Sequence, residues 1–209
     1  FSTLSSGSIN GIQTICYSGN PSTLGNVSSP SGGSGSYIYQ WQYSNNGTSG
    51  WTNIGGATST SYDPPGNLTS SRWYRRQVQS CTQTKYSNSV KVTVRPDLSS
   101  GTITNAHTIC YGGDPSSLGN GSSPSGGDGN YAYQWQYSNN GSNGWTTIGG
   151  ATSSTYNPPG GLTADRWYRR GVTSCGETKH TVAVKVMVEA KVAATAAAAM
   201  EVVALEVVM

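Results

Sequence analysis

Charged side chains are scarce in this sequence: Asp, Glu, Lys and Arg make up 10% of its 209 residues, and histidine occurs twice. The net charge of +3 is too small to indicate a nucleic-acid surface. No apolar run ahead of the C-terminal tail approaches the roughly 20 residues of a membrane-spanning helix. Phenylalanine occurs once, but 13 Tyr and 6 Trp are present. Low charge with abundant Tyr, Trp, Thr and Val favours short strands joined by Gly- and Ser-rich turns.

The sequence repeats itself after 94 residues, so that residues 4–94 superpose on residues 98–188 with about two thirds of positions identical. This period fits a complete domain better than a solenoid unit. We therefore expect two tandem domains, residues 1–96 and 97–189. The tail, residues 190–209, is rich in Ala and Val, and we interpret it as the start of a further domain with uncertain residue identity.

The two copies act as an internal control on any shared chemistry. His107 and His180 both lie in the second copy, where the first has Gln and Tyr, and Asp63 of the first copy becomes Asn in the second. An activity common to both copies could not use these residues as a nucleophile's base or as an acid–base pair. Neither clustered histidines nor a Cys-x-x-Cys motif is present to bind a metal. We predict no enzyme activity and no cofactor.

The segment around Trp41 is the centre of each copy. Tyr39, Trp41 and Tyr43 alternate with Gln, which is the period of a strand with one buried face, and the Asn-Asn-Gly that follows predicts a turn. The same letters return around Trp135. We predict that Trp41 and Trp135 are core residues.

Further short strands surround this central one, and turn signals separate them. The patterns predict strands over residues 8–16 with a break at Gly11, 22–24, 51–54, 59–62, 72–80 and 90–94, whereas residues 28–36 read as a loop with nothing to bury. About seven strands per copy predict an antiparallel β-sandwich.

The strand patterns resemble the third and sixth strands of immunoglobulin-like domains, in Tyr39-x-Trp41 and in Tyr74-x-Arg76-x-Val78. Arg76 stands where the immunoglobulin pattern has a Cys, so the usual inter-sheet disulfide is absent. The motifs Gln-Thr-Ile-Cys-Tyr, Tyr-Gln-Trp-Gln and Trp-Tyr-Arg-Arg make both copies similar to the tandem repeats of large Bacteroidota cell-surface adhesins, the SprB-like gliding adhesins. The resemblance implies an all-β fold of two tandem immunoglobulin-like domains, export to the cell surface, and a role in attachment or gliding.

Each copy contains two cysteines, which are Cys16 and Cys81 in the first and Cys110 and Cys175 in the second. With two per domain and none spare, we predict one disulfide within each domain and none between domains. Closing so long a loop contributes about 4 kcal/mol in the chain-entropy model. Disulfides also indicate an extracellular location.

Two surface features could bind a ligand. Arg75 and its copy Arg169 could form a patch for acidic polysaccharide or lipid headgroups; alternatively, strand alternation sends Arg75 outward and Arg76 inward beside Trp41 as structural residues. Trp51 and its copy Trp145 follow the hairpin turn and could be platforms for sugar rings, or could simply cover one end of the sandwich.

We interpret the chain as a segment of a longer exported protein, a non-catalytic structural or adhesive part of a surface filament. The expected partners are neighbouring repeats, surface polysaccharide or substratum, and like filaments, without nucleic acid. The rival interpretation is a pair of carbohydrate-binding modules from a secreted enzyme. The connection after Val94 is short, is stiffened by Pro96 and has Gly101 as its one free pivot, so we expect the domains to stack end to end.

Overall fold

A computed structural model describes residues 2–191 of the chain, and all regular elements in that range are β-strands. The expected start of a further domain in the tail falls outside the described residues, except for 190 and 191. The strands of the first repeat are β1 (Ser2–Ser5), β2 (Ser8–Asn10), β3 (Gln13–Ile15), β4 (Gly25–Ser28), β5 (Ser31–Gly33), β6 (Ile38–Ser44), β7 (Thr52–Asn53), β8 (Arg72–Ser80), β9 (Gln83–Tyr86) and β10 (Val90–Val94). Those of the second repeat are β11 (Thr102–Thr104), β12 (His107–Ile109), β13 (Gly119–Ser122), β14 (Ala132–Ser138), β15 (Thr146–Thr147), β16 (Arg166–Ser174), β17 (Glu177–His180) and β18 (Val184–Val188).

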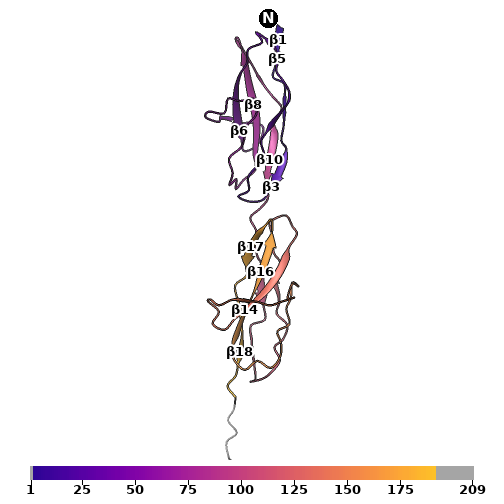
Figure 1. Ribbon diagram of the computed structural model, residues 1–209, viewed down its shortest axis with the longest axis vertical. Helices are drawn as coiled ribbons and strands as arrows, with labels where there is room; N and C mark the ends of the chain where they lie inside the picture. The colour runs from indigo at the N-terminus through magenta and orange to yellow at the C-terminus, as the bar shows by residue number, and fades with distance from the viewer. Residues whose placement is uncertain (1, 192–209) are drawn as a thin grey trace, which may run out of the picture. The chain divides into compact units, whose positions relative to one another are not determined.

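The main sheet of the first repeat has the order β3-β10-β8-β6-β7, and β9 also pairs with β8 (Figure 1). Strands β6 and β8 are antiparallel over their whole length, with Trp41 opposite Arg76. Strand β3 joins the edge of the sheet parallel to β10, and Gln13 lies opposite Val92. The second repeat builds the same sheet in the order β12-β18-β16-β14-β15, with β17 beside β16. The prediction of an all-β chain with two tandem β-sandwich repeats is thus confirmed, but the repeats are not wholly antiparallel, because β3 and β12 pair in parallel with β10 and β18.

The second layer of each sandwich is made from short pieces. In the first repeat, β2 pairs with β4 and β1 pairs with β5, and isolated bridges join Leu24 to Tyr62 and Gly19 to Leu68. The buried residues Ile9, Leu24 and Leu68 of this layer pack against the main sheet. Short strands suffice because turns and side chains carry the remaining backbone hydrogen bonds, as when Asn88 bonds both the N–H and the carbonyl of Ile9.

The strongly patterned segments were predicted well, and the polar ones were not. Strands β8 and β10 have the predicted bounds, and the break at Gly11 separates β2 from β3. The loop expected over residues 28–36 contains β5, which pairs with β1, while residues 59–62 contribute only the bridge at Tyr62. Ser- and Gly-rich strands such as β5 carry no apolar alternation, because their contacts are backbone hydrogen bonds.

The connection between the repeats is held by hydrogen bonds. Pro96 accepts a hydrogen bond from the Gly127 N–H at 3.0 Å, and Ser99 bridges to Ser125. A Cβ added to Gly101, which has φ +63°, would lie 2.3 Å from the Ser122 carbonyl oxygen. Gly101 is thus packed against Ser122 of its own repeat, and its role as a free pivot between the repeats stays a prediction.

The described residues group into two compact units that differ from the sequence repeats. The first comprises residues 2–100 together with 124–132 and 173–179, and the second comprises 101–123, 133–172 and 180–191. Two segments of the second repeat, the loop before β14 and the tip of the β16–β17 hairpin, therefore belong to the unit built around the first repeat. The most buried side chains of both units include the predicted core indoles.

Trp41 and Trp135 are both fully buried, which confirms their predicted place in the core. The Trp41 indole packs against the Tyr62 ring, with 5.6 Å between ring centroids, and its Nε1–H donates to the Ser59 carbonyl at 2.9 Å. Trp135 makes the equivalent contacts with Tyr156 and Ser153. A buried indole with its one donor satisfied contributes its full apolar area to the core.

An arginine lies fully buried beside each core Trp. The Arg76 guanidinium donates through Nη1 to Asn26 Oδ1 at 2.9 Å and to the Thr60 carbonyl at 2.6 Å, and it lies over the Tyr39 ring at 5.0 Å. The inward orientation predicted for Arg76 is observed, with Tyr39 rather than Trp41 as the aromatic partner. Burial lowers the pKa of Arg76, and Tyr39 opposes that shift. Arginine side chains stay protonated in proteins, so the buried group is treated as a cation. Neutral oxygens compensate a charge that would otherwise be costly to bury.

We expect Trp41→Ala to lower the free energy of unfolding by about 3–5 kcal/mol, because it removes a packed indole and leaves a cavity. Trp135→Ala should have the same effect. Denaturant unfolding followed by circular dichroism measures it, with Ile12→Ala as control because Ile12 is 77% exposed. A midpoint for Trp41→Ala equal to that of the control would place the indole outside the core.

Asn26→Ala should cost about 1–3 kcal/mol, because it leaves the buried Arg76 charge without one of its acceptors. The matched control is Val27→Ala, since Val27 is 61% exposed and a Gly occupies its position in the second repeat. Because the guanidinium stays protonated, the loss should be the same from about pH 5 to pH 9. Stability equal to that of Val27→Ala would contradict a role for Asn26 in compensating this charge.

Candidate functional site

The outer face of the main sheet carries a stack of Trp, Arg and Tyr side chains. The Arg75 guanidinium lies over the Trp51 ring at 4.2 Å and over the Tyr86 ring at 4.0 Å. Arg75 comes from β8, Tyr86 from β9, and Trp51 from the residue before β7. The structure thus brings together Trp51 and Arg75, the two residues singled out in the first repeat. Tyr86 joins them without having been predicted.

Hydrogen bonds fix the position of the Arg75 side chain. Its Nε donates to Gln42 Oε1 at 2.8 Å, and Gln42 Nε2 donates to Asn53 Oδ1 at 2.7 Å and to Gln77 Oε1 at 3.2 Å. Burial lowers the pKa of Arg75, and Tyr86 partly opposes the shift. Gln42 and the two aromatic rings thus hold the Arg75 guanidinium in one position on the sheet face.

The second repeat keeps the pair and changes the third member of the stack. Arg169 lies over the Trp145 ring at 4.3 Å, and its Nε donates to Gln136 at 2.8 Å. His180 replaces Tyr86, and burial together with the Arg169 charge lowers the pKa of its imidazole. The Trp–Arg–Gln arrangement is therefore common to both repeats, whereas the third residue is not.

The turn after β6 places Trp51 beside this face. Asn46 Oδ1 accepts hydrogen bonds from the backbone N–H groups of Thr48 and Ser49, each at 2.9 Å. Gly47 has φ +77°, and a Cβ there would lie 2.5 Å from the Trp73 ring. The Asn-Asn-Gly sequence thus forms a fixed turn, as predicted, because only glycine fits beneath Trp73.

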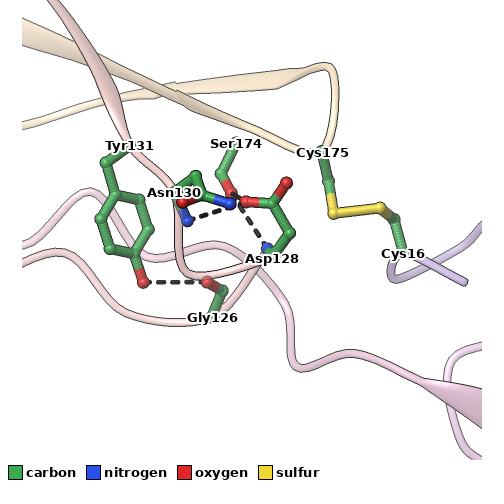
Figure 2. The surroundings of a disulfide bond; sticks show 7 residues. All are labelled: Cys16, Gly126, Asp128, Asn130, Tyr131, Ser174 and Cys175. Atoms are coloured by element: carbon green, nitrogen blue, oxygen red, sulfur yellow. Dashed lines mark hydrogen bonds between the residues drawn. A yellow bond between two sulfur atoms is a disulfide. The ribbon is translucent and has the colours of Figure 1, made fainter. Parts of the chain in front are cut away.

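The disulfide prediction is wrong. Cys16 is bonded to Cys175, with 5.9 Å between their Cα atoms (Figure 2). Cys81 and Cys110 are free and exposed. The bond joins the first repeat to the β16–β17 hairpin of the second, and both cysteines belong to the first compact unit. A link between the repeats is the arrangement that the sequence analysis had excluded.

The sheet register explains why no disulfide forms within a repeat. Cys16 follows β3, whose last residue, Ile15, lies opposite Val94 at the end of β10. Strand β10 runs antiparallel to β8, so this level lies just before β8 begins, whereas Cys81 follows its last residue, Ser80. The two cysteines are therefore separated by about ten strand residues, or roughly 30 Å. A disulfide requires Cα atoms about 4.4–6.8 Å apart.

Hydrogen bonds order the loop next to the disulfide. Ser174 Oγ donates to the Asp128 carboxylate at 2.8 Å and accepts from the Asp128 N–H at 3.1 Å, and Tyr131 donates to the Gly126 carbonyl at 2.9 Å (Figure 2). Hydrogen bonds from the Asn130 backbone and from Ser174 lower the pKa of Asp128. Lys179 on β17 forms an ion pair with Asp97 at 2.7 Å.

His107 lies at the position that Gln13 occupies in the first repeat. His107 Nδ1 lies 2.7 Å from the Asn105 carbonyl oxygen, and its Nε2 accepts from the Ser116 N–H at 3.0 Å. The corresponding Gln13 makes the equivalent bonds to Gly11 and Ser22 in the first repeat. His107 therefore holds a loop closed, as Gln13 does.

Within residues 2–191, no group of three or more His, Cys, Asp or Glu side chains is arranged to hold a metal ion. In the same part of the chain, no helix has the length and apolar character needed to cross a membrane.

Several solved structures are similar to this chain at low sequence identity. A Dscam isoform structure is 12% identical with a TM-score of 0.39, covering 90% of this chain and 46% of its own. The Sidekick-1 immunoglobulin domains 1–5 are 12% identical with a TM-score of 0.39, covering 86% and 36%. The extracellular domains 3–5 of Drosophila OTK are 11% identical with a TM-score of 0.36, covering 85% and 58%. The chain therefore spans less than two thirds of each.

A comparison with curated proteins finds no match. The family described as a domain of unknown function, DUF8696, matches residues 5–96 and again residues 99–190. Both matches contain the core Trp, the buried Arg and the two cysteines of one repeat. The chain belongs to this family and contains two tandem copies of its domain.

Proposed function

We propose that this chain is a non-catalytic structural and adhesive segment of a long extracellular surface protein, with domains at residues 1–96 and 97–189. The observation that carries the proposal is the disulfide between the two copies of one domain. Such a bond supports a location outside the reducing cytosol. It also suits a protein that gains length by repetition and must keep its repeats together under tension. Attachment of cells to a substratum, or gliding as in SprB-like adhesins, is the finer form of this proposal.

The resistance of the chain to pulling follows from the position of the bond. Cys16 and Cys175 are 159 residues apart in sequence, so the intervening chain lies inside a covalently closed loop. A force applied at the two termini passes through the sulfur atoms and bypasses most of both repeats. Only the segments outside the loop can extend while the bond is intact.

Single-molecule pulling from the termini should show this directly. The oxidised chain should lack roughly 50 nm of contour length that the Cys16→Ser/Cys175→Ser variant releases, at about 3.4 Å per residue. The Cys81→Ser/Cys110→Ser variant is the matched control and should behave like the oxidised parent. Equal contour lengths for the parent and the Cys16→Ser/Cys175→Ser variant would contradict a mechanical role for the bond.

The surface role needs a test on cells. Antibodies raised against residues 2–191 should label intact, unpermeabilised cells that produce the protein, and their Fab fragments should reduce attachment of those cells to a solid surface. Fab fragments of unrelated specificity are the control. Labelling only after permeabilisation would overturn the extracellular placement, and undiminished attachment would overturn the adhesive role.

The rival function is carbohydrate binding through Trp51 and Trp145. In each repeat, one ring face is in contact with an arginine whose position is fixed by Gln42 or Gln136. This contact favours a structural role for the two indoles.

Polysaccharide pull-down should therefore give the same retention for the parent chain and for Trp51→Ala/Trp145→Ala. The matched control is Ile12→Ala, which changes an apolar residue that is 77% exposed. Retention by the parent that is lost in the Trp double variant alone would support the binding-module function instead.

A further inference from the structure

Cys81 and Cys110 occupy the same places in their repeats as the two bonded cysteines. Cys81 corresponds to Cys175, and Cys110 corresponds to Cys16, by the 94-residue repeat. Each free cysteine can therefore be compared with a counterpart that forms a disulfide. The comparison lies within one chain and between domains about two thirds identical, so local backbone conformation can be compared directly.

The backbone at the free cysteines already has the bonded conformation. Cys81 has φ 53° and Cys175 has φ 56°, both in the turn that follows a nine-residue strand. A positive φ is uncommon for a residue other than glycine, so its occurrence at both positions marks a shared requirement. The Cys110 carbonyl accepts from the Gly113 N–H at 2.9 Å, as the Cys16 carbonyl does from Gly19.

A shallow cavity lies next to Cys110, at the position where the first repeat contacts a loop of the second repeat. This cavity of about 280 Å³ is lined by Cys110, Tyr111, Glu189, Ala190 and Lys191. In the first repeat, the position of Ala190 is held by Pro96, whose carbonyl accepts from the Gly127 N–H. The cavity therefore corresponds to the surface that the loops of a following repeat cover. Asp97, which pairs with Lys179, is replaced by Lys191, so the cysteine is present at both places and that ion pair is not.

We infer that Cys81 and Cys110 are the two halves of further inter-repeat disulfides, each bonding to another copy of this domain. Cys81 forms a disulfide with the cysteine of a preceding repeat that corresponds to Cys16. Cys110 forms a disulfide with the cysteine of a following repeat that corresponds to Cys175. Every junction of such an array would then carry one disulfide. The inference rests on the repeat chemistry alone and does not depend on the adhesive role proposed above.

Joining two cysteine thiols in a disulfide needs a two-electron oxidant, and oxidised glutathione is the oxidant in the test. Glutathione first forms a mixed disulfide with Cys110 and releases one reduced glutathione. The Cys81 thiolate of another molecule attacks the Cys110 sulfur, the bond to glutathione breaks, and the second glutathione leaves as a thiolate that takes up a proton. Two cysteine thiols thus lose two electrons and two protons, and one oxidised glutathione becomes two reduced ones.

The pairing rule can be tested with two single variants of the whole chain in a glutathione redox buffer at high protein concentration. Cys81→Ser keeps only the Cys110 thiol free, and Cys110→Ser keeps only Cys81 free. One of them carries a short tag, so that non-reducing electrophoresis separates the mixed dimer from the two homodimers. Peptide mapping first verifies that both variants retain the Cys16–Cys175 bond, which shows that the fold is intact.

We expect the mixed dimer, linked through Cys110 and Cys81, to exceed either homodimer roughly tenfold in an equimolar mixture, against the twofold excess that random pairing gives. The parent chain should form a ladder of oligomers that collapses on reduction, and Cys81→Ser/Cys110→Ser should stay monomeric. Statistical pairing in the mixture, or glutathione adducts without mixed dimer, would overturn the inference. Neither result would bear on surface attachment, which the antibody experiment measures separately.

Discussion

The burial of one indole between two short-stranded layers is the interaction on which each repeat depends. Trp41 is fully enclosed, and the residues around it, Leu24, Leu68 and Val92, come from both layers. Hydrophobic residues make up 34% of the sequence, and the other fully buried hydrophobic side chains of the first repeat are Tyr, Leu and Val. The core is therefore small and centred, and the short strands of the second layer are held in place mainly because they cover this ring.

The Arg76 guanidinium connects the two layers of the sandwich, so the layers do not need a disulfide between them. Arg76 lies opposite Trp41 on the neighbouring strand and bonds to Asn26 and Thr60 of the other layer. It thus connects the two layers by hydrogen bonds at the position where the immunoglobulin pattern has a cysteine. With the layers joined in this way, Cys16 and Cys175 link one repeat to the next.

A second arginine, Arg75, makes a network of contacts on the outer face of the main sheet. Arg75 contacts two rings and Gln42, which makes the exposed face of the sheet a connected layer of side chains. The stack recurs at Arg169 although its third member has changed from Tyr to His. Retention of the Trp–Arg pair in both copies agrees with a role in stiffening the β6–β7–β8 face.

The sequence by itself determined the repeat, the β class, the central strands and the buried Trp, because apolar alternation and near-identity of two copies are local signals. It also placed Arg75 and Arg76 on opposite faces of β8, since strand side chains alternate. It could not place β5, whose Ser and Gly residues contribute backbone hydrogen bonds without a side-chain pattern. Tyr86 escaped prediction because β9 is polar and short, so its neighbour across the sheet was not evident.

The disulfide was decided by the tertiary structure alone. Counting cysteines paired Cys16 with Cys81, but the parallel pairing of β3 with β10 places Cys16 at the end of the sheet opposite to Cys81. No local sequence signal reports a parallel edge strand, because the same residues would fit an antiparallel one. Which cysteines can meet is a matter of distance across the assembled sheet, and that distance exists only once the strands are in register.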